Sequence, residues 1–281
     1  MNEKVNYWVD NLDPFIFRIH GDIGVRYYGV AYLLGFVAAI FLLKLYYKKG
    51  KSPLDSDQVD NSIFAIVAGV LVGGRVGYII FYAWPAFCSD PLTLFKVWQG
   101  GMSSHGGFIG VIIAALWIAR RQKIPFMQLA DILASVTPIG LFFGRIANFI
   151  NGELWGKVTN VPWAVIFPKS APPDTPVMFI EPRHPSQLYE ASLEGLFLFI
   201  YLQVRFWFGK TLKSPGRLSG EFLILYAIVR ILGEQFREPD AALIMGVSRG
   251  IFYSYFMILA GVAFIVYSIR NPLKEKTESD A

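Results

Sequence analysis

Seven long apolar runs constrain this chain more than any other feature of its sequence. A transmembrane helix needs about 20 largely apolar residues, and seven segments reach or approach that length. They are 27–47, 60–83, 105–119, 125–149, 186–208, 219–236 and 250–269. Only 17% of the 281 residues are charged, whereas about a quarter are charged in a typical soluble domain. We therefore predict an all-α integral membrane protein with seven transmembrane helices.

The basic residues between these runs predict the orientation. Lys and Arg are concentrated in 44–51, 120–123 and 205–217, and in the C-terminal tail. Because cytoplasmic loops are enriched in Lys and Arg, we expect the N-terminus outside and the C-terminus in the cytoplasm. The net charge of +5 then serves contacts with anionic membrane lipids, and we expect no nucleic-acid partner.

The longest segment outside the apolar runs is 151–184, which this orientation places on the outer side. Seven prolines between Pro162 and Pro185 argue against a continuous helix there. We predict a small periplasmic cap on a single membrane-embedded domain, residues 1–270. We expect a polar cytoplasmic tail, 271–281, to follow it, and we expect no removable signal peptide at the N-terminus.

One apolar run contains a glycine repeat. Gly69, Gly73 and Gly77 recur every four residues, so they share one helix face. This spacing lets another helix approach closely, and packing explains it without a functional role.

Charged side chains inside the apolar runs need a physical explanation, because a central arginine costs about 2.5–3.5 kcal/mol in a membrane. These residues are Arg75, Arg145, Arg230, Glu190, Glu194 and Glu234. Arg230 and Glu234 lie four residues apart and can pair on one helix. Arg145 has no preceding acid at helical spacing, so its partner must come from another helix, from water or from a ligand. Arg75 has a structural alternative, in contact with headgroups rather than with reacting lipid.

The densest group of polar residues is GRIANFINGELWG, 144–156. It contains Arg145, Asn148, Asn151 and Glu153 at the outer end of one run, with Gly156 allowing a close approach of a ligand. A guanidinium group binds phosphate bidentately, and amides add further donors. The segment therefore predicts a site for phosphate or another oxyanion.

This segment resembles the signature of the prolipoprotein diacylglyceryl transferase family, GR-x-x-NF-x-N-x-E-x-x-G, and matches it completely. Five other segments agree in order and position: RYYG at 26–29, GGRVGY at 73–78, GGMSSHGG at 100–107, RHPSQLYE at 183–190 and RILGEQFREPD at 230–240. The resemblance covers about residues 12–270.

The resemblance implies an enzyme of the bacterial cytoplasmic (inner) membrane that acts in the first step of lipoprotein maturation. Such an enzyme moves a diacylglyceryl group from phosphatidylglycerol to the lipobox cysteine of a prolipoprotein signal peptide. A thioether forms and glycerol 1-phosphate leaves. The nucleophile belongs to the substrate, so the single cysteine of this chain, Cys88, needs no catalytic role.

The resemblance also implies catalytic residues. Arg145 and Arg230 are similar to the essential arginines of the family, and we expect them to hold the lipid phosphate; structural salt bridges are the alternative. Asn148 and Glu153 match signature positions and would bind the headgroup or orient Arg145, although Glu153 has a turn-stabilising alternative. Tyr28 matches an essential tyrosine, whereas by its position alone it would be read as an interfacial aromatic residue.

The remaining site residues have supporting roles. His105 is the expected general base, because histidine changes protonation near neutral pH; Glu153 or the surroundings of the substrate are alternatives. We expect Asn151 and Gly156 to contact the lipid, Gly156 through its small size. His184 is expected to anchor the start of the run 186–208. Three acids are expected to hold the arginines in place: Asp131, Glu190 and Glu234.

Two alternatives from other functional classes remain. One is a transporter or channel for an anionic solute or lipid, and the other is an inactive lipid-binding scaffold. Three scattered histidines without a CxxC or HExxH motif give no metal-ligand set, so we expect neither a metal nor a cofactor. The chain departs from the family at Ile251, where a glutamine is expected, which puts a role for that side chain in doubt.

Overall fold

The computed structural model describes residues 7–20, 23–96, 100–209 and 213–273. The chain forms two compact units, one from Met1–Ala39 with Leu133–Ala281 and the other from Ile40–Ile132. Helices α1 (Tyr27–Lys48) and α5 (Phe126–Ile150) each contribute to both units. The single domain expected over 1–270 stays a prediction. Most of the expected tail, 271–281, lies outside the described residues.

The unit Ile40–Ile132 is built around helices α2 (Ser56–Tyr82) and α4 (Ser104–Gln122), with the short α3 (Trp84–Ser89) and the 3-10 turn η1 (Pro91–Phe95) between them. The start of α2 is fixed by a reciprocal cap. The carboxylate of Asp55 accepts from the backbone N–H of Gln58 at 2.8 Å, and the Gln58 side chain accepts from the Asp55 N–H at 3.0 Å.

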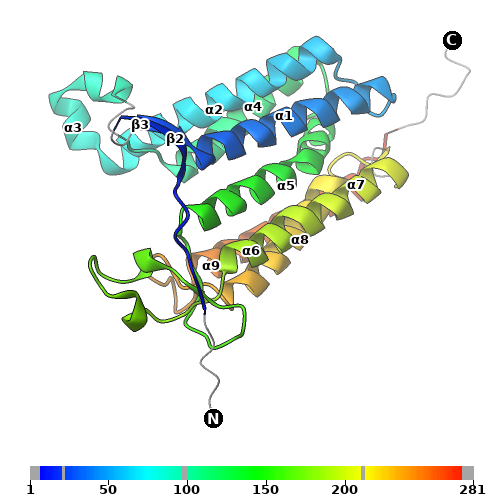
Figure 1. The fold of residues 1–281 in the computed structure, drawn as a ribbon. Helices are drawn as coiled ribbons and strands as arrows, with labels where there is room; N and C mark the ends of the chain where they lie inside the picture. The colour runs from blue at the N-terminus through cyan, green and yellow to red at the C-terminus, as the bar shows by residue number, and fades with distance from the viewer. Residues whose placement is uncertain (1–6, 21–22, 97–99, 210–212, 274–281) are drawn as a thin grey trace, which may run out of the picture. The chain divides into compact units, whose positions relative to one another are not determined.

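Glycines allow α2 and α4 to lie side by side (Figure 1). A Cβ atom added to Gly77 would lie 2.6 Å from the Cα of Gly106, and one added to Gly73 would lie 2.9 Å from the Cα of Gly110. Real Cβ atoms do not approach other atoms this closely. The glycine repeat therefore marks a close helix contact, as the sequence predicted.

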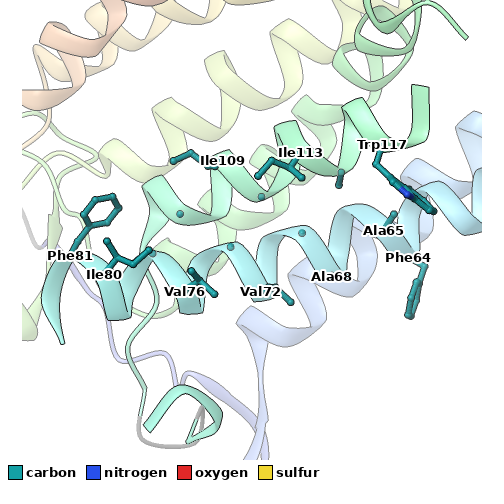
Figure 2. Close-up of a pocket in the computed structure, with 16 residues that line it drawn as sticks. Phe64, Ala65, Ala68, Val72, Val76, Ile80, Phe81, Ile109, Ile113 and Trp117 are labelled. Atoms are coloured by element: carbon teal, nitrogen blue, oxygen red, sulfur yellow. The ribbon is translucent and has the colours of Figure 1, made fainter. Parts of the chain in front are cut away.

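Larger side chains of the same two helices border an apolar groove above this glycine contact (Figure 2). Phe64, Val76 and Ile80 come from α2, and Ile113 and Trp117 come from α4. Such a surface suits a hydrocarbon environment rather than water.

Arg75 of α2 is buried and bonded to backbone carbonyl groups of the loop that follows α3. Its Nε donates to the Leu94 oxygen at 3.0 Å, and its Nη1 donates to the Gly101 oxygen at 3.0 Å. Further bonds reach the oxygens of Thr93, Lys96 and Gly100. These bonds favour a structural role for Arg75, although through the protein backbone rather than through headgroups.

The other unit contains one long helical segment made of α6 (Ser186–Glu190), the π-helical turn η5 (Ala191–Phe197) and α7 (Leu198–Phe208). The helices α8 (Arg217–Glu234) and α9 (Arg249–Arg270) pack against each other. Their contact uses Gly220 and Gly261, because a Cβ on either would lie within 2.8 Å of a backbone oxygen of the other helix.

Residues 151–184 contain only short elements, as the prolines predicted. They are the strand β4 (Val165–Ile166) and the 3-10 turns η3 (Pro168–Ser170) and η4 (Val177–Phe179). Strand β1 (Trp8–Val9) pairs in parallel with β4, and β2 (Phe15–His20) pairs antiparallel with β3 (Ile23–Arg26). The all-α class is therefore corrected to mainly α with two small sheets. Strands this short leave no clear periodic pattern in a sequence.

All seven predicted runs are helical, but they differ in how well they suit a membrane. Among the described residues, five helical segments are long and apolar enough to span one: α1, α2, α5, Ser186–Phe208 and α9. The helices α4 and α8 fall outside that group. α8 carries four charged side chains, Arg217, Glu221, Arg230 and Glu234, which lower its hydropathy. The chain is thus a multi-pass helical membrane protein, and the number seven stays a prediction.

The glycine contact between α2 and α4 gives a stability prediction. We expect Gly110→Ala to lower the free energy of unfolding by about 1–3 kcal/mol, because the added methyl group meets the Gly69 backbone. The matched control is Gly107→Ala on the same helix, where the new Cβ would meet only the Val70 oxygen at 3.8 Å. Thermal unfolding in detergent measures both. Equal melting temperatures for the two variants would contradict the contact.

Candidate active site

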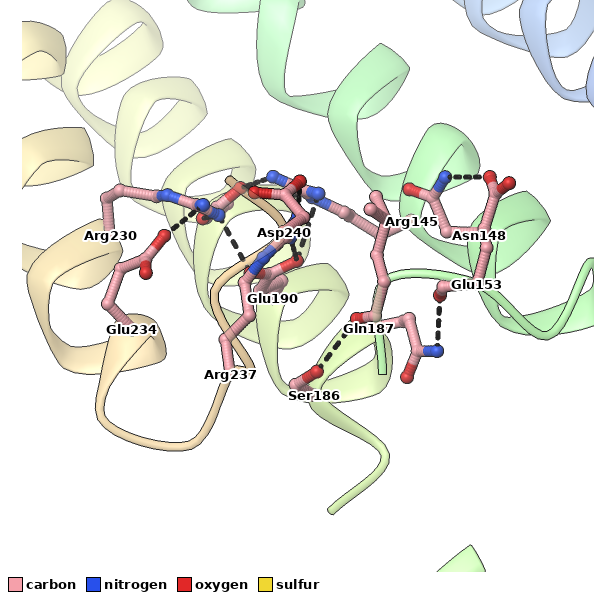
Figure 3. A network of polar contacts seen from close by, with 12 residues as sticks. Arg145, Asn148, Glu153, Ser186, Gln187, Glu190, Arg230, Glu234, Arg237 and Asp240 are labelled. Atoms are coloured by element: carbon pink, nitrogen blue, oxygen red, sulfur yellow. Dashed lines mark hydrogen bonds and ion pairs between the residues drawn. The ribbon is translucent and has the colours of Figure 1, made fainter. Parts of the chain in front are cut away.

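A cluster of arginines and glutamates joins α5, the helical segment 186–208 and α8 (Figure 3). Arg145 comes from the last turns of α5, Glu190 from α6, and Arg230 from α8. Arg237 follows the end of α8. All of these residues belong to the unit that contains Leu133–Ala281.

Glu190 is the shared partner of three guanidinium groups. Its carboxylate lies 2.9 Å from Nη1 of Arg145, 2.7 Å from Nη1 of Arg230 and 3.1 Å from Nη1 of Arg237. Its side chain is 1% exposed. A buried carboxylate is stable only when it is paired and hydrogen-bonded, and here three segments supply the donors.

Glu194 adds a second buried carboxylate to the same arginines. It accepts from Nη2 of Arg145 at 2.9 Å, from Nη1 of Arg230 at 3.1 Å and from the Tyr226 hydroxyl at 3.4 Å. Glu194 lies on the π-helical turn, a feature that is frequent at functional sites. Two glutamates therefore bridge Arg145 and Arg230 across separate helices.

Arg230 also pairs with Glu234 on α8, which confirms the predicted i,i+4 pair. α9 packs closely against this pair at Gly250, because a Cβ atom added there would lie 2.8 Å from Nε of Arg230. Arg237 binds Asp240 at 2.9 Å, and the Asp240 side chain is 59% exposed.

The buried part of the cluster is balanced in charge. Three arginines, Arg145, Arg230 and Arg237, face three buried glutamates, Glu190, Glu194 and Glu234. This balance explains how the charges are tolerated in an apolar protein.

A second polar group joins Tyr28, Asn148 and Glu153. The Tyr28 hydroxyl donates to Oε1 of Glu153, and Nδ2 of Asn148 donates to the same oxygen at 2.8 Å. The Asn148 amide also contacts the Tyr28 hydroxyl. Asn148 follows Arg145 by one turn of α5, so this helix connects the two groups (Figure 3). Three of the predicted catalytic residues are therefore in direct contact.

The segment after α5 turns sharply and carries Glu153. Gly152 has φ 59° and Leu154 has φ 56°. The N–H of Gly156 donates to the His184 oxygen at 2.9 Å, and a Cβ on Gly156 would lie 2.6 Å from the Cβ of His184. Gly156 is thus required for packing of the chain itself. Oδ1 of Asn151 is buried and has no hydrogen-bond partner among the described residues.

His184 lies just before α6, and its expected role as an anchor stays a prediction. Its Nδ1 is 3.2 Å from the Tyr189 hydroxyl, and its ring packs edge-on against Phe236. Burial lowers the pKa of His184, which favours the neutral ring. Glu190 and Glu234, two of the three acids expected to hold the arginines, form ion pairs with them.

Two predicted site residues belong to the other unit, Ile40–Ile132. His105 is the second residue of α4 and is exposed, and Asp131 is buried in α5. The expected base role of His105 and the expected supporting role of Asp131 stay predictions from the sequence.

Arg237 and Gln187 had no individual role predicted for them, although both take part in these networks. Arg237 binds Glu190, and Nε2 of Gln187 donates to the Glu153 oxygen at 2.6 Å. Both lie in segments that resemble the family, RILGEQFREPD and RHPSQLYE. One feature of the sequence could have indicated an ion pair of Arg237. It lies three residues before Asp240, in the same segment as Arg230.

The cluster offers no evident metal site. Among the described residues, no group of three or more His, Cys, Asp or Glu side chains is arranged to hold a metal ion. The clustered carboxylates are instead engaged by guanidinium groups.

The fold and the site define a helical membrane protein with a buried arginine–glutamate cluster next to a tyrosine–asparagine–glutamate group. The family model described as prolipoprotein diacylglyceryl transferase matches residues 14–267. The chain belongs to this family.

Three relatives illustrate the similarity, and each is named phosphatidylglycerol–prolipoprotein diacylglyceryl transferase. The protein of Photorhabdus laumondii is 46% identical over 277 residues, which cover 93% of this chain and 94% of the relative. That of Proteus mirabilis is 45% identical over an alignment length of 286, and the match covers 95% of this chain and 96% of the relative. That of Mannheimia succiniciproducens is 47% identical over 263 residues, which cover 92% and 94%.

The shared role of Glu190 gives a second stability prediction. We expect Glu190→Gln to lower the free energy of unfolding by about 3–5 kcal/mol, because it leaves buried guanidinium groups without their common counter-charge. Asp240→Asn is the control at the exposed edge of the same network, where an ion pair contributes about 0–1 kcal/mol. Thermal unfolding of the two variants in detergent tests the difference, and similar losses would show that Glu190 has no special role.

Proposed function

We propose that this protein transfers the diacylglyceryl group of phosphatidylglycerol to the lipobox cysteine of a prolipoprotein. The observation that carries the proposal is the family match over residues 14–267, with relatives of that activity name at similar lengths. The contacts among Tyr28, Asn148 and Glu153, and those of Arg145, support it. Arg145, Asn148 and Glu153 match the family signature, and Tyr28 lies in the segment RYYG, which also resembles the family.

The reaction makes two demands on the protein. The thiol of the acceptor cysteine has a pKa of about 8.5 in water and must lose its proton before its sulfur attacks. A C–S bond then forms at the glyceryl carbon as the C–O bond to phosphate breaks, and glycerol 1-phosphate leaves with the bonding electron pair. Donors placed around the phosphate stabilise this developing charge.

Arg145 and Arg230 meet the second demand in this proposal. Their side chains are 15% and 14% exposed, whereas their shared carboxylate partner Glu190 is only 1% exposed. A guanidinium group has five N–H donors. The bonds of Arg145 to Glu190 and Glu194 involve each of its three nitrogens once. Counted over the part of the chain that the structure describes, one N–H on each terminal nitrogen of Arg145 is therefore left for a phosphate oxygen.

In the same proposal, Glu190 and Glu194 determine how the arginines bind a phosphate. Because they neutralise the arginines, the site binds phosphate through directed hydrogen bonds more than through excess positive charge. An anion held in this way can be released as glycerol 1-phosphate without a large electrostatic penalty. Asn148, Asn151 and Gly156 would contact the headgroup beside Arg145, and Tyr28 would do so through its hydroxyl. Glu153 and His105 are the two candidates for the base.

We also propose seven membrane spans, with the N-terminus and the segment 151–184 outside and the C-terminus in the cytoplasm of a bacterial cell. The charges of α8 are compatible with a span because they are paired. Glu221 accepts from Nη2 of Arg205 at 2.7 Å and from Nε of Arg217 at 2.9 Å, and Arg230 binds Glu190. The orientation of the basic loops then directs the site toward the periplasmic side.

A transfer assay tests the proposal. Purified protein is mixed with phosphatidylglycerol vesicles and a lipobox peptide, and mass spectrometry follows a diacylglyceryl-sized gain on the cysteine. We expect Arg145→Ala to lower the rate at least about 100-fold, the size of effect typical of a lost oxyanion donor. Arg205→Ala is the control, since Arg205 is also salt-bridged but pairs with Glu221; its rate should stay within a few-fold. Solute flux through liposomes without any mass gain would replace the transferase with a transporter.

The base is tested by pH dependence. If His105 takes the thiol proton, His105→Asn should be slower than wild type at neutral pH and should show a different pH profile, because an asparagine side chain cannot accept the proton. Coinciding rates and profiles for the two proteins would leave Glu153 as the candidate base, which Glu153→Gln tests in the same assay.

A further inference from the structure

The first two residues of α6 hold the turn that carries Glu153. Nε2 of Gln187 donates to the Glu153 carbonyl oxygen at 2.6 Å, and the Ser186 hydroxyl donates to the Leu154 carbonyl oxygen at 3.0 Å (Figure 3). Both side chains are fully buried. Side chains in a helix are tilted toward its N-terminus. At the start of α6 this tilt directs Ser186 and Gln187 toward the turn that carries Glu153.

The turn needs such support because its backbone is unfavourable. Gly152 and Leu154 both have positive φ, 59° and 56°. The left-handed region is costly for a residue with a Cβ atom, and Leu154 can occupy it only when its surroundings fix it. The bond from Ser186 is made to the carbonyl group of Leu154 itself.

These bonds fix Glu153 on both sides. Its N–H donates to the Asn148 oxygen at 3.2 Å, and its carbonyl oxygen accepts from Gln187. With both peptide groups held, the carboxylate stays directed at Tyr28 and Asn148, from which it accepts hydrogen bonds. The oxygen of the same amide, Oε1 of Gln187, is buried and accepts no hydrogen bond from the described residues. The bond from Nε2 to Glu153 is therefore the contact through which this side chain acts on the turn.

We propose that Gln187, assisted by Ser186, is a positioning residue for the Tyr28–Asn148–Glu153 group. It acts through the Glu153 backbone and holds the carboxylate where it can serve the reaction. This inference rests on the proposed transferase function and adds to it the residues that set the geometry of Glu153.

The test compares two glutamines of the same helical segment, Gln187, which is buried, and Gln203, which is partly exposed. Gln187→Met keeps the length and packing of the side chain and removes the donor to Glu153. Gln203→Met is the matched control, because Nε2 of Gln203 donates to another backbone oxygen, that of Ser135, at 2.9 Å.

Both variants are assayed as full-length protein in mixed micelles of phosphatidylglycerol with a lipobox peptide. We expect Gln187→Met to lower kcat at least about tenfold, about 1.4 kcal/mol, with KM for phosphatidylglycerol changed less than about threefold. Gln203→Met should stay within about twofold of wild type.

A double variant separates positioning from general destabilisation. If Gln187 acts through Glu153, adding Gln187→Met to Glu153→Gln should reduce kcat by less than about threefold further, because coupled residues are not additive. A multiplicative loss, or a Gln187→Met protein as fast as wild type, would overturn the inference.

If Gln187→Met does not fold, Ser186→Ala carries the test, with kcat expected about three- to tenfold lower; an unchanged kcat overturns the inference. A wild-type protein without transfer activity would overturn the proposed function and this inference together, whereas an active wild type with unaffected variants overturns the inference alone.

Discussion

The carboxylate of Glu190 contacts the guanidinium groups of Arg145, Arg230 and Arg237, which lie on separate segments of the chain. In an apolar interior each of these charges is costly unless it is paired, so the helices that carry them must pack together. The side chains of Arg145 and Arg230 stay 15% and 14% exposed within this pairing. A structural salt bridge and a phosphate-binding role are therefore compatible for Arg145, because the carboxylates orient the donors that a phosphate would use.

The second polar group depends on the first through α5. Asn148 lies three residues after Arg145, about 4.5 Å along the helix axis, and it shares Oε1 of Glu153 with Tyr28. The turn after α5 then determines where Glu153 lies. Its left-handed residues are stabilised by Ser186 and Gln187 at the start of the helix that also carries Glu190. One helical segment thus supports both polar groups.

Much of this molecule was predictable from local pattern. Apolar length predicted every long helix, four-residue spacing predicted the pair Arg230–Glu234, and the glycine repeat predicted the contact that Gly73 makes on α4. The two small sheets were missed, because strands of two to six residues carry no clear period. Arg237 was missed as an individual residue because its partner, Glu190, lies 47 positions away.

The sequence by itself determined that the chain is a helical membrane protein with charges that require partners, since apolar run length and the cost of burying a charge are both properties of local composition. It also determined the family, through the segment 144–156. Only the tertiary structure decided which carboxylate meets Arg145, and that Gln187 holds the Glu153 turn. Such pairings join residues far apart in the chain, and they follow from helix packing and hydrogen-bond geometry, which no local spacing encodes.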